Sequence, residues 1–345
     1  MTPMCGGKSY GDTPLFDAAE GTVVRSPLQS ARGWWAGAPT ANFDSATNSF
    51  YLVYRYRQPR ELGRGVECRI AASDNGITFN DIWALPKTSF DALSIERCAL
   101  TRSPSGGWIL YVSYVNPQDN RWCVALLEAD EPDRFDAALM RPLFDAAGTG
   151  TEGVKDPNVF QIGPMYYMLV SYAVPLDGLQ QEMRDQQHRT GDIYNTGLTL
   201  SRSAAAVSNN GIDFRWIGDV SPVAGSRVIV PRVDKSIVEP KREWDDYCRR
   251  VSTITPLSSG GFLALYDGSA SVNENYEEKT GIAISYDLRN YVSLSPSAPH
   301  LEVSEGTGSL RYIDILSVGH ELFYYYEAAR TDGSHELRVN VVEQP

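Results

Sequence analysis

The sequence has 345 residues and a formal net charge of −12, and so acidic a chain is not expected to bind nucleic acid, because phosphates attract a basic surface. Its 19 Tyr, 29 Gly and 20 Pro favour strands and turns over helices. No apolar stretch reaches the roughly 18 residues of a membrane span, and residues 1–16 lack the pattern of a secretory signal. We therefore expect a cytoplasmic, all-β protein without a membrane partner.

Cysteine and histidine are too few and too scattered to predict a metal site. The five cysteines include no Cys-x-x-Cys pair, and none of the four histidines stands at the spacing of zinc ligands. We expect reduced thiols that pack as small apolar side chains. The cysteines are Cys5, Cys68, Cys98, Cys123 and Cys248. The sequence predicts no metal ion and no other cofactor.

One unit recurs five times along the chain: a polar start, an apolar strand, a turn, an aromatic-rich strand, and a third strand that ends in a polar turn. The first two copies begin at AGAPTANFDSATNSFYLVYRYR and IERCALTRSPSGGWILYVSYV. The later copies begin at KDPNVFQIGPMYYMLVSYA, RRVSTITPLSSGGFLALYDG and LRYIDILSVGHELFYYYEA. The second strand of each copy is apolar and β-rich, as expected for strands buried between stacked sheets.

The copies are evenly spaced except for one long interval. Their strand starts are separated by 60, 60, 93 and 62 residues, and the long interval holds two polar excursions, residues 174–196 and 221–243. The strand starts are Ala36, Glu96, Asp156, Arg249 and Arg311. Five antiparallel units of this size predict a five-bladed β-propeller with an axial funnel. A β-sandwich or two barrels is the alternative, because twisted antiparallel strands give similar patterns.

We expect the whole chain, residues 1–345, to form one domain, since all-β folds of this length are common as single units. The predicted blades cover about 34–90, 91–145, 150–220, 245–300 and 305–345, and an N-terminal segment closes the ring. The turns SDNG and SNNG supply the residues with positive φ that tight turns require.

Three stretches resemble the five-bladed propeller glycosidases, the superfamily that holds glycoside hydrolase families 32, 43, 68 and 130. They are YRYRQPRELGRGVECRIAASDNGITF, GVKDPNVFQIGPMYYMLVSY and TGIAISYDL. In that superfamily the first strand of each blade lines the funnel, and acidic residues at the strand starts act on the glycosidic bond. Asp156 in KDP resembles the Asp of the R-D-P or E-D-P motif, and Glu96 in IERC resembles another funnel acid. The first copy reads AGAP where families 32 and 43 carry an Asp.

The resemblance places eight charged residues near the funnel, in four groups. Because side chains alternate along a strand, only one residue of a neighbouring pair is expected to face the axis fully. We favour Glu96, Asp156, Arg250 and Arg311. The full set is Glu96 with Arg97, Lys155 with Asp156, Arg249 with Arg250, and Arg311 with Asp314.

Glycoside cleavage needs one carboxylic acid and one carboxylate, and Glu96 and Asp156 are the predicted pair. Crowded carboxylates raise one pKa, while neighbouring Arg and Lys hold the other group ionised. The alternative is that both acids belong to ion pairs that brace neighbouring blades.

Several arginines at one mouth predict an anionic ligand, because guanidinium binds carboxylate or phosphate in a forked geometry. A uronate, a phosphorylated sugar and free phosphate all fit, and family 130 phosphorylases use basic residues in this way. The contrary interpretation is that Arg55, Arg57, Arg97 and Arg250 only neutralise buried acids.

Aromatic residues near the strand starts are candidate platforms for a sugar ring: Trp34, Trp35 and Tyr247. Asp267 in YDG is a candidate acceptor for a hydroxyl group or a plain turn residue. The polar excursion at residues 175–195 predicts a short helix or a rim loop, and such insertions commonly cover sites.

The sequence thus predicts a glycoside-active enzyme, most simply a hydrolase of a small glycoside or oligosaccharide, with neutral and anionic substrates both open. Glu96 and Asp156 are the predicted catalytic pair. The predicted substrate-binding residues are Trp35, Arg97, Lys155, Arg250, Asp267, Arg311 and Asp314. The rival functions are a glycoside phosphorylase and a non-catalytic propeller that binds carbohydrate or an anion. The oligomeric state cannot be inferred from the sequence.

Overall fold

The computed structural model describes residues 13–224, 243–258 and 260–344. This part of the chain is almost entirely strand, with two short α-helices, α1 (Ala146–Thr149) and α2 (Gln181–His188). Its 3-10 helices are η1 (Ala18–Glu20), η2 (Arg60–Leu62), η3 (Lys87–Phe90), η4 (Ala137–Leu139) and η5 (Ile193–Asn195). None of its helices has the length and apolar character needed to cross a membrane. The predicted all-β class is confirmed.

Antiparallel pairing joins most strands into groups of four that follow the chain. The first group is β2 (Trp35–Asp44), β3 (Ser49–Arg57), β4 (Gly65–Ser73) and β5 (Asn80–Pro86). The second is β6 (Ala99–Arg102), β7 (Trp108–Val115), β8 (Trp122–Ala129) and β9 (Arg141–Phe144). The third is β10 (Val154–Ile162), β11 (Met165–Pro175), β12 (Thr199–Ser208) and β13 (Arg215–Asp219). The fourth is β15 (Cys248–Pro256), β16 (Phe262–Ser269), β17 (Lys279–Ser285) and β18 (Val292–Ser293).

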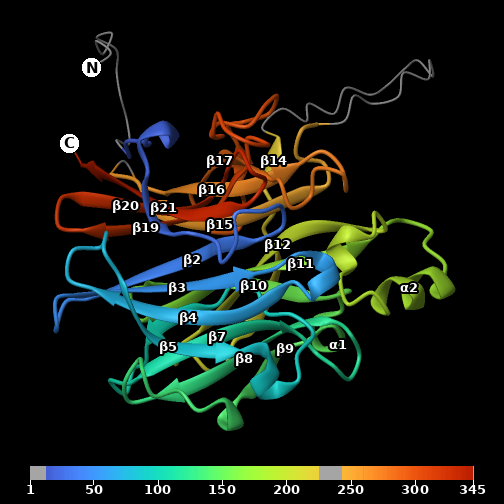
Figure 1. Ribbon diagram of the computed structural model, residues 1–345, viewed down its shortest axis with the longest axis horizontal. Helices are drawn as coiled ribbons and strands as arrows, with labels where there is room; N and C mark the ends of the chain where they lie inside the picture. Colours follow the sequence, from blue (N-terminus) through green and yellow to red (C-terminus); the bar gives the residue numbers. More distant parts are fainter. Residues whose placement is uncertain (1–12, 225–242, 259, 345) are drawn as a thin grey trace.

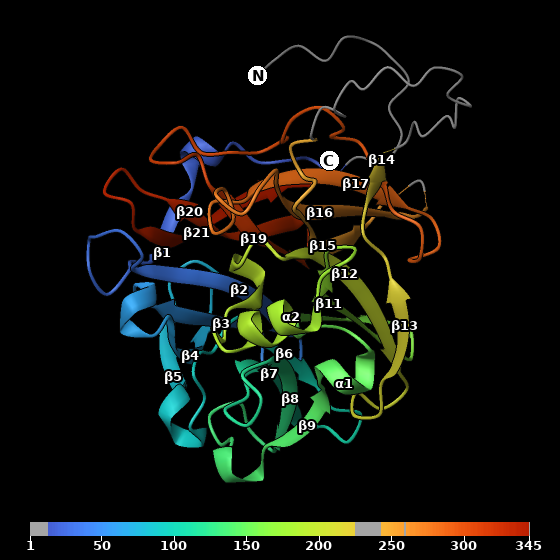
Figure 2. The same ribbon diagram turned by 90° about the vertical axis from the view of Figure 1, so that its right-hand side faces the viewer.

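The fifth group draws strands from both ends of the chain. It consists of β19 (Leu310–Val318), β20 (Glu321–Ala329), β21 (His335–Glu343) and β1 (Thr22–Arg25), which pairs with β21. The remaining strand, β14 (Val223–Ala224), pairs in parallel with β18. Figure 1 shows the groups as stacked ribbons, and in Figure 2 they surround the middle of the molecule.

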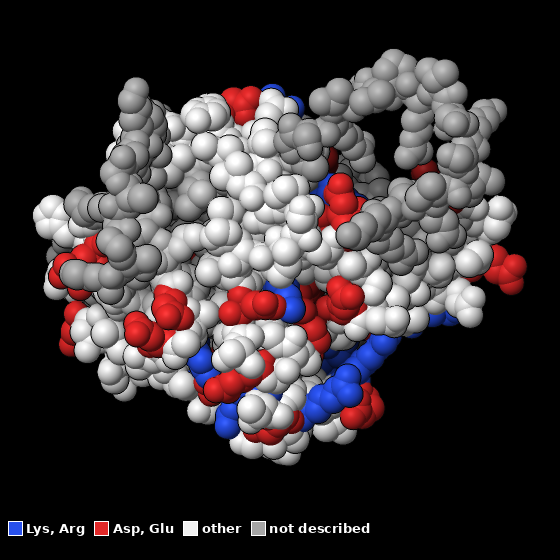
Figure 3. Space-filling view, turned by 90° about the horizontal axis from the view of Figure 1, so that it is seen from above, with Lys and Arg blue, Asp and Glu red and all other residues white. Residues whose placement is uncertain are grey.

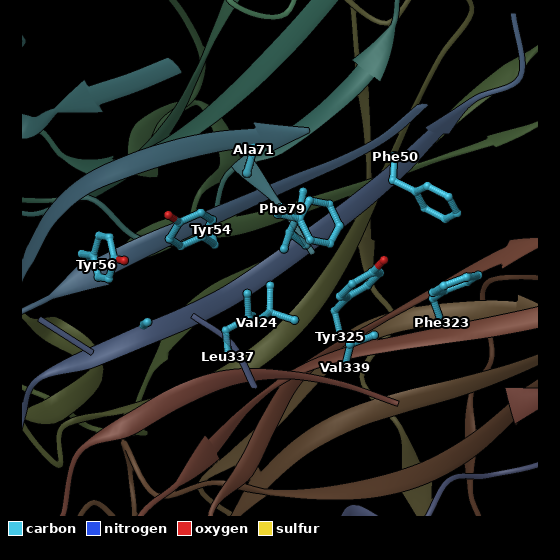
Figure 4. Close-up of a cluster of buried hydrophobic side chains, with 12 residues drawn as sticks. Val24, Phe50, Tyr54, Tyr56, Ala71, Phe79, Phe323, Tyr325, Leu337 and Val339 are labelled. Atoms are coloured by element: carbon cyan, nitrogen blue, oxygen red, sulfur yellow. The ribbon is translucent and has the colours of Figure 1, made fainter. Parts of the chain in front are cut away.

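A separate hydrophobic cluster fills the space between each two neighbouring groups. Between the first and fifth groups, aromatic side chains of β3 pack against those of β20 (Figure 4). Four further clusters lie between groups one and two, two and three, three and four, and four and five. Alternation along β3 turns Tyr54 and Tyr56 toward the first of these clusters, so that Arg55 and Arg57 project to the other face of the strand.

The turns SDNG and SNNG adopt the same conformation in two groups, after β4 and after β12. In each turn the glycine has positive φ, 71° at Gly76 and 74° at Gly211. The serine hydroxyl accepts the glycine N–H at 3.0 Å in both turns. This confirms the predicted need for positive φ.

The four described cysteines, Cys68, Cys98, Cys123 and Cys248, are free and buried, which confirms their packing as small apolar residues. Cys5 lies outside the described residues.

The first polar excursion forms α2 and η5, and α2 lies at the right-hand end of the molecule in Figure 1. This confirms the predicted helix or rim loop. Most of the second excursion, residues 225–242, lies outside the described residues. On the face seen from above in Figure 3, acidic and basic side chains lie close together and form no separate basic field.

Candidate functional site

The first strands carry bulges that turn extra side chains toward the centre. β2, β10 and β19 each contain one residue with positive φ at such a bulge: Ala38 (51°), Asp156 (56°) and Tyr312 (54°). A bulge interrupts the alternation of side chains. Our expectation that only one residue of a neighbouring pair faces the centre is wrong for Lys155 and Asp156, which are both buried. Arg250 is buried and Arg249 is half-buried, as expected.

Asp156 lies at the meeting point of three elements. Its Oδ2 is 3.0 Å from Lys155 Nζ and accepts hydrogen bonds from Arg250 Nη1 and the Tyr312 hydroxyl, both at 3.3 Å. Burial raises the pKa of a carboxyl, but Lys155 and Arg250 outweigh it and lower the pKa of Asp156 below its usual value. Its Oδ1 is buried and has no partner among the described residues. Asp156 is thus an ionised acceptor with one oxygen to spare.

The guanidinium of Arg250 binds two carboxylates of the chain. Its Nε and Nη2 donate to Asp267 Oδ2 at 2.9 and 2.7 Å, and its Nη1 donates to Asp156. Asp267 is fully buried and also accepts the Ser252 hydroxyl. Burial raises the pKa of Asp267 even though Arg250 opposes the shift.

Arg311 is bound in the same manner on the neighbouring group. Its Nε and Nη2 donate to Glu327 Oε1 at 3.1 and 2.7 Å, and its Nη1 donates to Glu278. Burial would raise the pKa of Glu278, but Arg311 and Arg250 lower it to about 2. Glu327 is fully buried, and Arg311 and Arg55 outweigh the effect of burial and hold its pKa well below the usual value.

Glu96 precedes β6 and is anchored by its backbone, whose N–H donates to Ser113 O at 2.9 Å. Its Oε1 accepts a hydrogen bond from Arg55 Nε, and Arg55 Nη2 donates to Glu327 Oε2 at 2.9 Å. The guanidinium of Arg55 therefore links the second group to the fifth.

The ring of Tyr312 lies among four guanidiniums at the centre. Arg250 stacks on it at 4.0 Å from the ring centroid, and Arg55, Arg97 and Arg311 lie 6.0, 5.9 and 5.2 Å from it. A ring with a negative face stabilises cations that are crowded in this way.

Arg97 and Asp314 tie the first strands together deeper in the molecule. Arg97 donates to Pro39 O and Ser252 O at 2.8 Å each, and its Nη2 lies 3.7 Å from Asp314 Oδ1. Asp314 accepts Asn158 Nδ2 at 2.7 Å, and burial raises its pKa despite Arg97. Both residues therefore bind the protein's own groups.

A small cavity of about 10 Å³ lies beside Glu96 and Lys155, room for roughly one water molecule. Trp122, Tyr194 and Asp192 also line it. Lys155 Nζ lies 5.4 and 4.8 Å from the rings of Trp122 and Tyr194. We call this space the inner cavity.

Asp192, from the polar excursion, closes the inner cavity on the outside. It forms ion pairs with Arg64 at 2.9 Å and Arg60 at 3.2 Å, and it accepts the Tyr276 hydroxyl at 2.7 Å. The excursion is held down by Glu152, which binds Arg184 and His188 of α2 at 2.8 and 2.6 Å. The inserted segment thus covers the centre, as the sequence suggested.

A larger pocket of about 380 Å³ opens above Arg57 and Tyr276, which line both this pocket and the inner cavity. We call it the mouth pocket. Trp35, Arg32, Arg60 and Asn275 contribute to its wall, as do Glu61 and Glu277. Its size is within the range of small-ligand sites.

Three of the predicted site residues line these two spaces. Glu96 and Lys155 line the inner cavity, and Trp35 lines the mouth pocket. Tyr247 lies elsewhere, in the wall of another pocket. The structure buries a further set in ion pairs and hydrogen bonds at the centre: Asp156, Arg97, Arg250, Asp267, Arg311 and Asp314.

Sequence reasoning missed Glu278, Glu327, Asp192 and Tyr276. Glu327 had a signal, since it follows the wholly apolar run LFYYY.

Arg249 binds the acidic cluster of Glu243, Asp245 and Asp246 away from the centre, so the preference for Arg250 agrees with the structure. Within the described residues, that acidic cluster is the one group with the spacing of metal ligands, and Arg249 already binds it.

No family model and no curated protein matches the sequence of this chain. Solved structures match its fold. A structure of RS223-β-xylosidase has a TM-score of 0.60 at 10% identity and covers 92% of this chain and 94% of its own. A thermostable family-43 glycoside hydrolase has a TM-score of 0.58 at 13% identity, with 89% of both chains covered. β-1,2-Mannobiose phosphorylase from Listeria innocua has a TM-score of 0.56 at 15% identity, with 92% of both chains covered. The resemblance to the propeller glycosidase superfamily is confirmed at the level of the fold.

Proposed function

We propose that the five strand groups are the blades of a single propeller and that its funnel acts on a glycoside. Hydrophobic clusters between all five pairs of neighbours support a closed ring. The pairing of β1 with β21 supports closure by an N-terminal strand. Hydrogen bonds from Arg97 and Asn158 to other first strands support a common axis.

The observation that carries the proposal is the layered arrangement at one end of the funnel. The mouth pocket shares Arg57 and Tyr276 with the inner cavity, which Glu96 and Lys155 line. Lys155 Nζ lies 3.0 Å from the carboxylate of the buried Asp156, whose Oδ1 has no partner among the described residues. The ring of Trp35 is already stacked on His335 and in contact with Arg57, so the pocket offers a sugar polar groups more than an aromatic face, and a buried unpaired acceptor suits a hydroxyl or water. The fold is that of enzymes named as glycoside hydrolases and a phosphorylase.

Asp156 and Glu96 take different roles in this proposal. Lys155 and Arg250 lower the pKa of Asp156, which suits a nucleophile or a base that takes the proton from water. Glu96 lines the cavity and would protonate the glycosidic oxygen as its bond to the anomeric carbon breaks. The ion pair of Glu96 with Arg55 must loosen for it to do so.

Phosphorolysis is the second candidate, and Ala38 favours it. Ala38 and Asp156 occupy the same bulge position before a proline, so the first strand offers a methyl group where another acid would stand. A phosphate ion that attacks the anomeric carbon needs no base to activate it, and Arg32, Arg57 and Arg60 line the mouth pocket, which is large enough to hold the ion. A non-catalytic carbohydrate-binding propeller is the third candidate, favoured by the ion pairs of both acids.

The test is turnover of a panel of aryl glycosides and disaccharides with and without inorganic phosphate. Hydrolysis predicts free sugar in either buffer, whereas phosphorolysis predicts a sugar 1-phosphate only when phosphate is present. Saturable binding with no turnover of any panel member would assign the protein to the binding class and contradict the enzymatic proposal.

A further inference from the structure

Arg57 differs from the other buried arginines of the centre in its surroundings. Its guanidinium lies between two aromatic rings, 4.1 Å from the centroid of Trp35 and 3.9 Å from that of Tyr276. The residue is only 4% exposed. Among the described residues it has no ion-pair partner within 4.0 Å and no hydrogen-bond partner. The two rings stand edge to face, at 66° to one another, so they contact the guanidinium on adjoining sides and leave its N–H donors without an acceptor among the described residues.

The edge of Arg57 faces space that a ligand can enter. Its Nε is fully buried and unpartnered, whereas its two terminal nitrogens are not among the fully buried unpartnered atoms. Since neither terminal nitrogen has a described partner, both reach accessible space. Arg57 lines the mouth pocket and the inner cavity, so this space belongs to them.

Unpartnered donors outnumber unpartnered acceptors around this site. Buried N–H groups without a described partner occur at Trp35 Nε1, Arg55 Nη1, Arg57 Nε and Trp122 Nε1, against the single acceptor Asp156 Oδ1. Buried polar groups are ordinarily satisfied, so a cluster of exceptions calls for a partner from outside the chain. A partner that satisfies donors must be rich in acceptors.

The charges of the mouth pocket leave a place for an anion. Its wall carries three arginines and two glutamates, Glu61 and Glu277. Glu277 is bound to His335 at 3.0 Å and to the Thr307 hydroxyl. Arg60 is paired with Asp192, and Asp192 is bound more closely to Arg64. Arg57 is therefore the buried cation of the wall that has no carboxylate bound to it.

We propose that the mouth pocket is a subsite for an oxyanion carried by the sugar ligand, a carboxylate or a phosphate, and that Arg57 binds it through two N–H donors. Trp35 and Tyr276 fix the guanidinium, so little side-chain entropy is lost when the anion binds. This assignment deepens the proposed function, because it makes the substrate an acidic sugar. Arg57 differs in this respect from Arg250 and Arg311, whose N–H groups donate to carboxylates of the chain.

The test compares acidic sugars with their neutral counterparts by titration calorimetry at low ionic strength. One arm uses D-glucuronate and D-galacturonate against D-glucose and D-galactose. The other uses D-glucose 6-phosphate and D-mannose 6-phosphate against D-glucose and D-mannose. We expect at least one acidic member to bind about tenfold or more tightly than its neutral partner, the gain typical of a charge-assisted contact. The arm in which it occurs distinguishes carboxylate from phosphate.

Variants of Arg57 then test whether this residue is responsible for the tighter binding of acidic sugars. Arg57→Met should abolish it and Arg57→Lys, which keeps the charge but not the fork, should reduce it several-fold. Arg141→Met removes an exposed arginine that pairs with Glu128 and should leave the preference intact. Melting temperatures show whether each variant is folded, and Arg57→Lys carries the test if Arg57→Met does not fold.

The inference is overturned if no acidic sugar binds more tightly than its neutral counterpart, or if the preference survives in both Arg57 variants. Failure of the proposed function is a different result. A protein that prefers acidic sugars but turns over no glycoside keeps this subsite and loses the enzymatic role. A protein that turns over neutral glycosides but does not prefer acidic sugars keeps the enzymatic role and loses this subsite.

Discussion

The centre of the molecule and the mouth pocket use arginine in opposite ways. At the centre, Arg311 is 1% exposed and its donors go to Glu327 and Glu278. In the mouth pocket, Arg57 is almost as buried but is held by aromatic rings, with no described acid bound to it. Charges that are paired inside the chain brace the fold, whereas a charge that is positioned but unpaired is free to meet a ligand. Whether a buried arginine has a carboxylate partner therefore distinguishes structural from ligand-binding arginines more clearly than its burial does.

The largest effect should come from breaking the central ion pairs. Arg311→Met leaves the buried carboxylates of Glu278 and Glu327 without their main partner, and removal of one partner from a buried pair costs about 3–5 kcal/mol. Urea unfolding should show this loss in the free energy of unfolding. The matched change Arg141→Met, in the exposed pair with Glu128, should cost less than about 1 kcal/mol. Equal losses in the two variants would refute the bracing role.

Acid should weaken the same network at a defined pH. Burial opposes ionisation of Glu278, but Arg311 and Arg250 outweigh it and lower its pKa from the ordinary 4.5 to about 2. A lowered pKa contributes stability that is present above the unfolded pKa and is lost as pH falls through the folded one. The contribution is on the order of 2–3 kcal/mol at neutral pH. The difference in unfolding free energy between wild type and Glu278→Gln should therefore shrink between about pH 5 and pH 2; a constant difference contradicts the assignment.

A smaller effect should follow from adding one methyl group beside the network. A Cβ at Gly37 would lie 2.1 Å from Glu327 Oε2, so Gly37→Ala must push the carboxylate away from Arg55 and the Ala38 N–H. Overpacking of this kind costs about 1–3 kcal/mol. Gly148→Ala is the control, because its added Cβ would come no closer than 3.2 Å to its nearest neighbour, the Asp145 side chain that caps α1. Chemical unfolding of both variants measures the difference, and an unaltered Gly37→Ala protein would mean that Glu327 is loosely held.

The repeat in the sequence predicted much of this architecture, because each copy carries its own strand pattern and turn chemistry. The strand starts Glu96, Asp156, Arg250 and Arg311 were predicted to lie inward, and all are buried. Local pattern contains this information, since each of these residues opens an apolar strand.

The sequence did not predict the partners of those residues. Glu327 lies opposite Arg311 in the β19–β20 pair, so that contact is local. The bonds from Arg55 to Glu327 and from Arg311 to Glu278 join different strand groups and depend on how the groups are arranged. The bulges that bring Lys155 and Asp156 to the centre together also lack a local signal, because Asp156 has positive φ without being glycine. The distinction between Arg55 and Arg57, two residues apart on one strand face, depends on Trp35 and Tyr276 and so on the folded structure.

The most direct test of the account is the pair of isosteric variants Glu96→Gln and Asp156→Asn, measured for both turnover and melting temperature. If the two carboxyls act on the glycosidic bond, each variant should lose about 100-fold or more of the turnover and still bind the substrate, because an amide keeps the shape and loses the proton chemistry. If the two acids only brace neighbouring blades, each variant should instead lose stability and keep its turnover. A large fall in melting temperature in both variants, with unchanged turnover per folded molecule, would contradict the proposal that these acids form a catalytic pair.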